Sequence, residues 1–202
     1  MSDYFTGNNI TEEEIRNLLS NRPEKGMSLP GNAPFRRAAV LIPLLHIDGE
    51  WHILFTRRTE TVQDHKGQVS FPGGASEGID KSAAETALRE AREEIGLNPE
   101  DVRVLGYMSQ YPSITDFLVT PVVGRIKWPF EMKISMSEVG RVFTIPIKWL
   151  ADPQNREEKL ITRPGGQVWV SYYKPYDNEI LWGLTARITV NFLEVLGLVK
   201  ME

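Results

Sequence analysis

The hydrophobic residues of this chain follow two patterns, short apolar runs bounded by turn residues and longer runs with helical spacing. Residues 37–47 and 51–58 are apolar runs joined at Asp48-Gly49, a dipeptide that favours a tight hairpin turn. They are predicted to be two antiparallel strands. Further strands are predicted over 102–110, 117–126, 142–147, 168–173 and 179–182, the last two forming a hairpin around Asp177-Asn178.

Helical spacing occurs near both ends of the chain. One helix is predicted to open at Thr11, where three glutamates follow a capping residue, and the segment 22–34 after it holds three prolines and is predicted to be a loop. A second helix is predicted over 184–199. Residues 147–150 are expected to form one helical turn.

The order of these elements indicates the fold class and the domain organisation. Strands in mostly antiparallel order with few helices are typical of α+β folds. A chain of 202 residues is long enough to bury one core, and it is interpreted as one domain. Residues 1–34 are expected to lead into this domain as a helix and a loop, and residues 35–202 to form the domain itself.

The central helix, in the run from Gly73 to Leu97, carries the main chemical signal. Positions i, i+3 and i+4 share one side of a helix, so Glu90, Glu93 and Glu94 project from one stripe. A second stripe, roughly 120° away, is apolar and consists of Ala84, Ala87, Leu88, Ala91 and Ile95. A solvated acidic face is one interpretation. The other is a site for a hard divalent cation such as Mg²⁺, which would relieve the repulsion between the carboxylates.

A glycine-rich segment precedes this helix. Phe71-Pro72-Gly73-Gly74 is predicted to be a sharp loop after a strand. Asp80 or Ser82 is suited to cap the start of the helix, and Gly96 is suited to the position just beyond its end. Because glycine lets the backbone approach a ligand closely, a carbonyl of Gly73 or Gly74 is expected to share a metal ion with the helix carboxylates.

Together these residues resemble the Nudix box, whose pattern is G-x5-E-x7-R-E-U-x-E-E-x-G-U with U an apolar residue. Residues 89–97 match its fixed positions, with Ala91 as a small occupant of an apolar slot. The first half instead reads Gly74-x5-Asp80-x8-Arg89, which has one extra residue and Asp in place of Glu. This variant resembles the coenzyme A pyrophosphatase branch of the Nudix hydrolases.

The residues upstream of the box carry the same resemblance. The branch motif L-L-T-x-R-S-x3-R-x3-G-x3-F-P-G-G is followed at its spacing over residues 54–74, with departures at Phe55, Thr59 and Gln63, the last standing where the branch has Arg. The resemblance implies a mixed β-sheet sandwiched between helices (α/β/α), with the box helix beside the active site.

The resemblance also implies roles for the box residues. Nudix hydrolases cleave a diphosphate linked to another moiety, with Mg²⁺ or Mn²⁺ as cofactor. By motif position, Glu90, Glu93 and Glu94 are the expected catalytic metal ligands. Arg89 lies on a different side of the helix and is expected to hold a carboxylate in place, either Asp80 or Glu90. A surface ion pair is the alternative interpretation of Arg89.

Residues outside the box complete the candidate site. Glu138 is a candidate general base, although a solvated loop glutamate is the alternative. Arg57, Arg58, His65 and Lys66 shortly precede the glycine loop and are candidates for binding substrate phosphates. Each of them is equally consistent with a solvated charge at a strand end.

Composition removes several classes of function. A formal net charge of −4 argues against a general nucleic-acid surface, and no apolar run reaches the length of a membrane span. The absence of cysteine excludes disulfides, thiolate metal sites and a cysteine nucleophile. The polar, acidic start of the sequence does not resemble a secretory signal, so a cytoplasmic protein is expected.

Three functions remain compatible with the sequence. The first is hydrolysis of coenzyme A or acyl-CoA to 3′-phosphoadenosine 5′-phosphate and (acyl-)phosphopantetheine, as the branch resemblance implies. The second is hydrolysis of another nucleoside diphosphate derivative, such as ADP-ribose. The third is a Nudix-like module that binds a nucleotide without cleaving it, although such a module has no need to keep all three box glutamates. In each case the partner is a small nucleotide, and a homodimer is compatible with the sequence.

Overall fold

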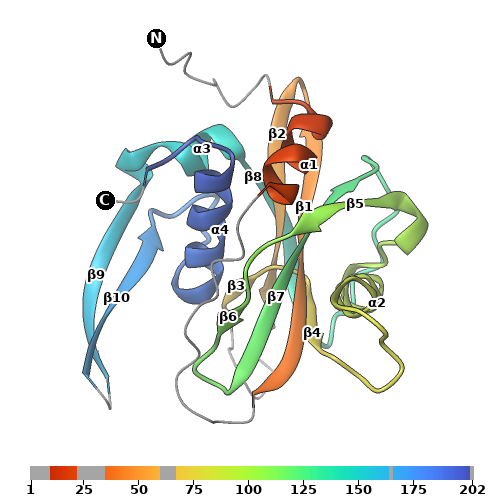
Figure 1. Ribbon diagram of the computed structural model, residues 1–202, viewed down its shortest axis with the longest axis horizontal. Helices are drawn as coiled ribbons and strands as arrows, with labels where there is room; N and C mark the ends of the chain where they lie inside the picture. The colour runs from red at the N-terminus through yellow and green to blue at the C-terminus, as the bar shows by residue number, and fades with distance from the viewer. Residues whose placement is uncertain (1–9, 22–34, 60–66, 164–165, 201–202) are drawn as a thin grey trace.

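The computed structural model describes residues 10–21, 35–59, 67–163 and 166–200 (Figure 1). Its helices are α1 (Glu12–Ser20), α2 (Ala83–Ile95), α3 (Ile147–Ala151) and α4 (Gly183–Val195), with short 3₁₀ turns η1 (Pro99–Asp101) and η2 (Pro153–Asn155). Its strands are β1 (Arg36–Ile47), β2 (Glu50–Arg58), β3 (Val69–Ser70), β4 (Gly73–Ala75), β5 (Val102–Tyr107), β6 (Tyr111–Pro112), β7 (Phe117–Ile126), β8 (Val139–Pro146), β9 (Arg156–Arg163) and β10 (Gly166–Tyr173).

A mixed sheet runs through the middle of the molecule in the order β3-β2-β1-β7-β5. β1 and β7 are parallel neighbours, whereas β2 pairs antiparallel with both β1 and β8. The predicted α+β class and the mixed sheet are therefore both confirmed. The expectation of mostly antiparallel order holds except for the β1–β7 pair, which lies at the centre of the sheet.

The sheet splits between β1 and β2. These strands pair only beside their shared hairpin, where residues 44–47 face residues 50–53. Beyond that point β4 pairs with β1 at residues 38–40, and β3 pairs with β2 at Thr56 and Arg57. The predicted glycine loop is thus partly a strand, and it fills the gap that the two diverging strands leave.

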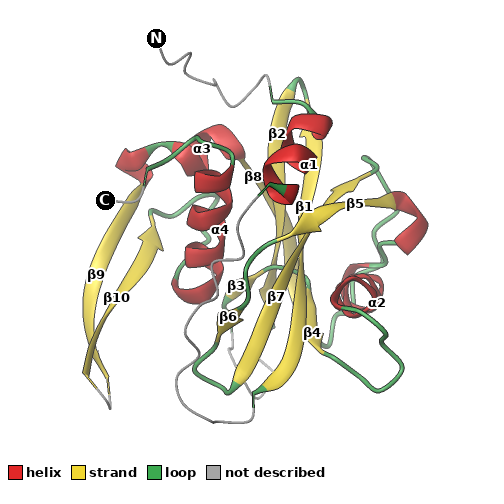
Figure 2. Cartoon of the chain, in the orientation of Figure 1, coloured by secondary structure: helices red, strands yellow, loops and turns green. Residues whose placement is uncertain are grey.

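Helices cover both faces of the sheet (Figure 2). On one face α2 packs against β1, β4 and β7, and Ala87, Ala91 and Ile95 of its apolar stripe are completely buried, as the spacing predicted. The opposite face is covered by α1, α3 and α4, which share a larger core with the sheet. The predicted α/β/α sandwich is confirmed, and α2 is the described helix that covers the face carrying the glycine segment.

Local signals account for the ends of α2. The Ser82 hydroxyl accepts a hydrogen bond from the Glu85 amide at 3.2 Å, so Ser82 and not Asp80 is the capping residue. Gly96 adopts φ 74°, and its amide donates to the last carbonyls of the helix. The helix thus begins and ends where its sequence predicted, which fixes the rotation of the glutamates about its axis.

Several predicted boundaries were wrong. The strand over 102–110 ends at Tyr107, and the helix over 184–199 ends at Val195, where the amides of Gly197 and Leu198 close it by bonding to carbonyls of the last turn. Residues 179–182 form no strand in the structure, and β10 pairs instead with β9, which the sequence reading missed. The predicted turn at Asp177-Asn178 is present, since both residues have positive φ.

No helix in the described part of the chain is both long and apolar enough to cross a membrane. Within those residues the longest helices, α2 and α4, have 13 residues each.

Candidate active site

The glycine segment lies directly against the carboxylates of α2. A Cβ atom placed on Gly74 would be 2.6 Å from the carboxyl carbon of Glu90. Gly73 has φ 152° and packs so tightly on β1 that an added Cβ would lie 2.4 Å from the Ala39 carbonyl oxygen. Only glycine fits at Gly73, whereas a side chain at Gly74 would displace the Glu90 carboxylate. The predicted close approach of the loop to the glutamates is therefore present in the structure.

Glu94 is a buried carboxylate at the bottom of this contact. Its side chain is 3% exposed, and its Oε2 accepts a hydrogen bond from the Gly73 amide at 3.3 Å. The pKa of Glu94 is raised to about 8, mainly by burial and also by the nearby charges of Glu90 and Glu138, although Arg58 and the Gly73 amide oppose the shift. Glu94 is thus an acidic group whose surroundings do not neutralise its negative charge.

Glu90 lies one turn earlier on the same side of α2. Its side chain is 16% exposed, and Arg89 Nη1 lies 2.9 Å from its Oε1. Burial is the main cause that raises the pKa of Glu90, the contact with Arg89 opposes it, and the charges of Glu93 and Glu138 add to it. The half-buried carboxylate of Glu90 and the buried carboxylate of Glu94 therefore both lie beside the glycine segment.

Glu93 differs from the other two box glutamates. Its side chain is 57% exposed, and its Oε2 accepts a hydrogen bond from Arg89 Nη1 at 3.1 Å. Glu93 therefore lies on the solvent side of Glu90, whereas Glu94 lies on the buried side. The shared stripe is real, but the three carboxylates have unequal surroundings, which spacing alone does not reveal.

Arg89 ties the segment before the helix to the helix itself. Its Nε and Nη2 donate to the two carboxylate oxygens of Asp80 at 3.2 and 3.1 Å, and Nη2 also donates to the Ala75 carbonyl at 3.0 Å. These hydrogen bonds lower the pKa of Asp80 to about 2 and raise the pKa of Arg89. Both predicted partners, Asp80 and Glu90, contact the guanidinium, which therefore orients a site carboxylate.

Glu138 reaches the site from the turn before β8. Its carbonyl accepts from the Thr59 amide at 3.0 Å, and the Ser135 amide in the same turn donates to the carbonyl of Glu94 at 2.9 Å. The β2–β8 register shifts where Arg58 pairs with Val139, which leaves Gly140 as an extra residue in β8. Glu138 is exposed, and its charge acts on both Glu90 and Glu94, so the structure brings this candidate base into their neighbourhood.

Of the four candidate substrate cations, the structure describes Arg57 and Arg58, and these two do not lie together. Arg58 Nη1 lies 3.9 Å from Glu94 Oε1, and its buried Nε has no hydrogen-bond partner within the described ranges. Arg57 points to the other face of β2, where its Nε lies 3.7 Å from Glu179. His65 and Lys66, like Gln63, lie outside the described residues. Of the two described candidates, Arg58 is therefore the one beside the carboxylates.

The sequence reading missed the partners of Arg57. Glu179 is a buried glutamate that also lies 3.2 Å from Arg141, and Arg141 pairs with Asp177 as well. Arg141 is the cross-strand neighbour of Arg57. No spacing in the sequence relates these positions, because they meet only through the β2–β8 pairing.

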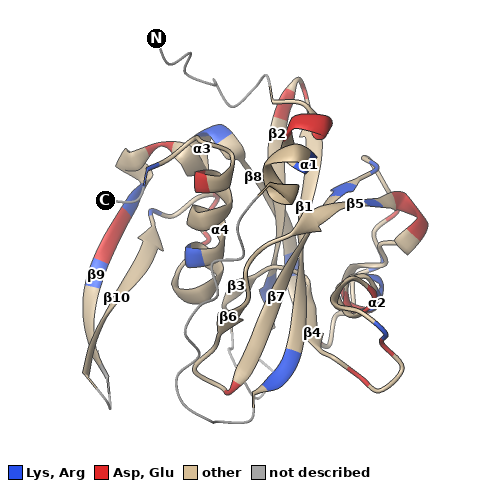
Figure 3. Cartoon of the chain, viewed as in Figure 1, with Lys and Arg blue, Asp and Glu red and all other residues tan. Residues whose placement is uncertain are grey.

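The chemistry of the donors fits a hard divalent cation. The carboxylates of Glu90 and Glu94 supply oxygen ligands, and their mutual repulsion in a half-buried place is the cost that a cation removes. Among residues 10–21, 35–59, 67–163 and 166–200, no three His, Asp or Glu side chains are already drawn together as a closed metal site. In Figure 3 acidic residues appear on α2 and in the loop that leads into it.

Solved structures resemble this fold. A Nudix hydrolase from Mycobacterium smegmatis, RenU, superposes with a TM-score of 0.56, covers 83% of this chain and 89% of its own, and is 16% identical. A MutT/nudix family protein from Enterococcus faecalis gives a TM-score of 0.51 over 93% of this chain and 80% of its own, at 14% identity. At such identities the likeness concerns the fold alone, which is the α+β sandwich of the Nudix hydrolases.

Comparison with known sequences gives a more specific result than the likeness of folds. The NUDIX domain model matches residues 34–170. The chain is 35% identical over 157 residues to the peroxisomal coenzyme A diphosphatase NUDT7 of mouse, covering 75% of this chain and 66% of that protein. It is 41% identical over 155 residues to NudL of Cronobacter sakazakii, described as an uncharacterized Nudix hydrolase, covering 76% and 79%.

The chain belongs to the Nudix family. It is thus a hydrolase of diphosphate bonds, of a family that acts on small nucleotide derivatives and generally uses divalent metals such as Mg²⁺ or Mn²⁺. The family match spans most of the described sheet and α2.

Gly74→Ala is expected to lower kcat/KM by about 10²-fold, because the new methyl group would displace the Glu90 carboxylate and a shift near 1 Å in a site has an effect of that order. Gly78→Ala in the same loop is the matched control, since nothing lies within 4 Å of its added Cβ. Steady-state kinetics on any diphosphate that the wild type cleaves tests this. Equal activity of the two variants would contradict the described contact.

The metal-free protein is expected to lose stability as pH rises because of Glu94. Its pKa is about 8 in the folded protein against 4.5 unperturbed, so folding binds an extra proton between these values. The resulting stability is complete below pH 4.5 and is lost as pH rises through 8. Urea unfolding in EDTA between pH 5 and 8 should show wild type declining relative to Glu94→Gln. Parallel profiles for the two proteins would refute the shifted pKa.

Proposed function

We propose that this protein hydrolyses the diphosphate bond of coenzyme A or acyl-CoA, giving 3′-phosphoadenosine 5′-phosphate and (acyl-)phosphopantetheine. The observation that carries the proposal is the pair of the half-buried Glu90 and the buried Glu94 beside the glycine segment, preceded by the branch motif over residues 54–74. The 35% identity to the mouse coenzyme A diphosphatase supports this choice of substrate. The protein is expected to act in the cytoplasm.

In the proposed site, the glutamates and Arg89 of α2 have separate roles. Glu90 and Glu94 would hold Mg²⁺ or Mn²⁺, with Glu93 contributing from the solvent side. When bound, such an ion neutralises charge on the diphosphate and lowers the pKa of an attacking water. Arg89 fixes the orientation of Glu90 through its bonds to Asp80 and Ala75.

Two further side chains act on the substrate in this proposal. The exposed carboxylate of Glu138 accepts the proton of the attacking water, because its turn is bound to the end of α2 and its position is near both buried glutamates. Arg58 lies on the same face, and the exposed part of its side chain, which is 29% exposed in all, would contact a phosphate oxygen. Arg57 is bound to Glu179 on the other face, so we assign it no substrate contact.

A second candidate is hydrolysis of another nucleoside diphosphate derivative, such as ADP-ribose. Gln63 favours it, since a cation of the coenzyme A branch motif is missing there. A module that binds without hydrolysis is less consistent with the site, because its buried carboxylates have a destabilising charge that only a proton or a cation offsets.

Removing the charge of Glu94 should abolish most activity. Glu94→Gln keeps the shape of the side chain and is expected to lower kcat by about 10³-fold, on the scale of losing a main electrostatic contributor. Exhaustive EDTA treatment should have the same effect on wild type, and added Mg²⁺ or Mn²⁺ should restore it. Glu100→Gln, an exposed acid in η1, is the matched control. Activity of Glu94→Gln within tenfold of wild type would remove Glu94 from the site.

Coenzyme A should be preferred over ADP-ribose by at least about tenfold in kcat/KM, or ~1.4 kcal/mol in transition-state binding. A substrate panel with mass spectrometry of the products measures this. Dephospho-coenzyme A tests whether the protein recognises the 3′-phosphate. A kcat/KM lower than that for coenzyme A means that a cation contacts this phosphate, and an equal value means that none does. If ADP-ribose is the better substrate, the second candidate replaces the first.

A further inference from the structure

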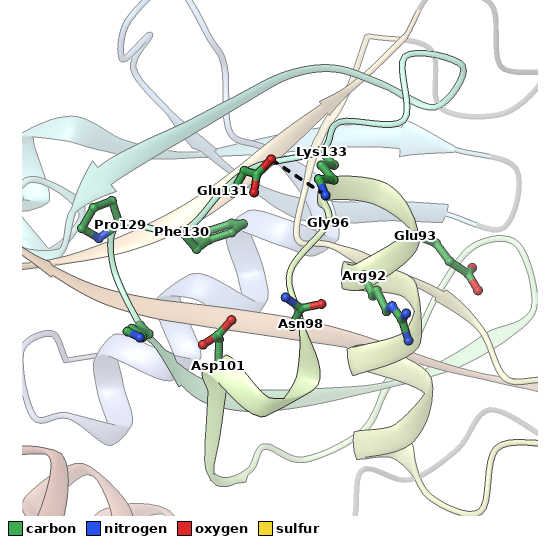
Figure 4. A pocket seen from close by; sticks show the side chains of 10 residues that line it. Arg92, Glu93, Gly96, Asn98, Asp101, Pro129, Phe130, Glu131 and Lys133 are labelled. Atoms are coloured by element: carbon green, nitrogen blue, oxygen red, sulfur yellow. Dashed lines mark ion pairs between the residues drawn. The ribbon is translucent and has the colours of Figure 1, made fainter.

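A separate hollow lies at the C-terminal end of α2 (Figure 4). Its volume is about 540 Å³, within the range of roughly 300–1,000 Å³ that small-molecule sites occupy. Its walls come from the end of α2, from η1 and from the segment 127–133 between β7 and β8. Glu90, Glu94 and Arg58 do not line it, so the hollow is distinct from the proposed catalytic centre.

The walls of this hollow are held together by the backbone. The Lys127 amide donates to the Asp101 carbonyl at 2.9 Å, and the Lys133 amide donates to the Ile95 carbonyl at 3.0 Å. Gly96 has φ 74°, and an added Cβ there would be 2.7 Å from the Lys133 nitrogen. The segment 127–133 thus crosses the helix end at a distance that only glycine permits. The hollow is therefore formed before any ligand arrives.

Its interior combines one aromatic ring with polar side chains. Phe130 turns its ring into the hollow, and Trp128 supports that ring in an edge contact at 5.9 Å and 73°. Asn98 and Asp101 point into the same space from η1 (Figure 4). A ring face next to an amide and a carboxylate suits a flat heterocycle, which stacks on the ring and bonds through its polar edge.

Among the charged side chains that line the hollow, two cations and the carboxylate of Asp101 have no ion pair within the described residues. Lys133 lies 3.8 Å from Glu131 across the rim, and Glu93 is bonded to Arg89. Arg92 and Lys127 also line the hollow, and no ion pair to either is present in the described part of the chain. A guanidinium and an ammonium without carboxylate partners are the groups that proteins use to bind phosphate.

We propose that this hollow is a second binding site, specific for a nucleoside monophosphate. The base stacks on Phe130 and meets Asn98 and Asp101 with its polar edge, and the phosphate lies between Arg92 and Lys127. Such a ligand contains both the flat heterocycle and the anion that the lining requires. The proposal does not depend on which diphosphate the enzyme cleaves, because the two sites share only Glu93 on their borders.

Calorimetric titration with adenosine 5′-monophosphate tests the proposal, using the whole chain in EDTA so that no metal supports binding at the catalytic centre. Saturable binding of one molecule per chain is expected. Adenosine and inorganic phosphate, titrated separately, should each bind at least about tenfold more weakly, because each satisfies only one half of the site. Quenching of Trp128 fluorescence, identified by its loss in Trp128→Phe, should follow the same isotherm.

Two variants and two controls locate the binding. Phe130→Leu removes the stacking face and Lys127→Gln removes an exposed cation, and each should weaken binding about tenfold. Glu94→Gln and Lys81→Gln should bind as wild type does, the first testing the catalytic centre and the second the general loss of a surface charge. The proposal is overturned if millimolar monophosphate gives no saturation, if both pocket variants bind normally, or if Glu94→Gln abolishes binding.

Discussion

The packing of the glycine segment on Glu94 is the contact on which the rest of the site depends. A carboxylate that is 3% exposed is stable as an anion only with compensating donors or a cation. The nearest compensation is small, consisting of one amide at 3.3 Å and one guanidinium at 3.9 Å. The folded protein therefore holds Glu94 in a state that favours protonation or metal binding. The proposed divalent ion would complete this compensation.

The contact is possible because the sheet is split. β1 and β2 diverge beyond their hairpin, and β3 and β4 enter the gap so that Gly73 and Gly74 lie beside α2. The helix must then be fixed in rotation, and Arg89 does this by joining Asp80, Ala75 and Glu90. The lowered pKa of Asp80 means that this tie remains ionised above about pH 2, so it persists while Glu94 titrates near pH 8.

The sequence predicted the parts of this arrangement that rest on local rules. The apolar stripe of α2, the Ser82 cap and the Gly96 terminus depend on residues within a few positions of each other, and all are present. The split sheet and β9 were missed because their pairing is set by distant strands. β9 has the charged start Arg-Glu-Glu-Lys and no alternation, so its strand state follows only from pairing with β10. For the same reason, the sequence did not predict the contact of Glu179 with Arg57.

Side chains alternate between the two faces of a strand, and this alternation decides which cation of β2 faces the carboxylates of α2. Arg57 and Arg58 are adjacent in sequence, so their side chains leave β2 on opposite faces. Arg58 reaches Glu94, whereas Arg57 reaches Glu179. Of this pair, only Arg58 faces the carboxylates, and it is already drawn toward Glu94. A divalent ion on Glu94 would replace the charge of Arg58 there and leave the guanidinium for a phosphate. In the proposed function, the residue that stabilises the metal-free site is thereby also one that would contact the substrate once the metal is bound.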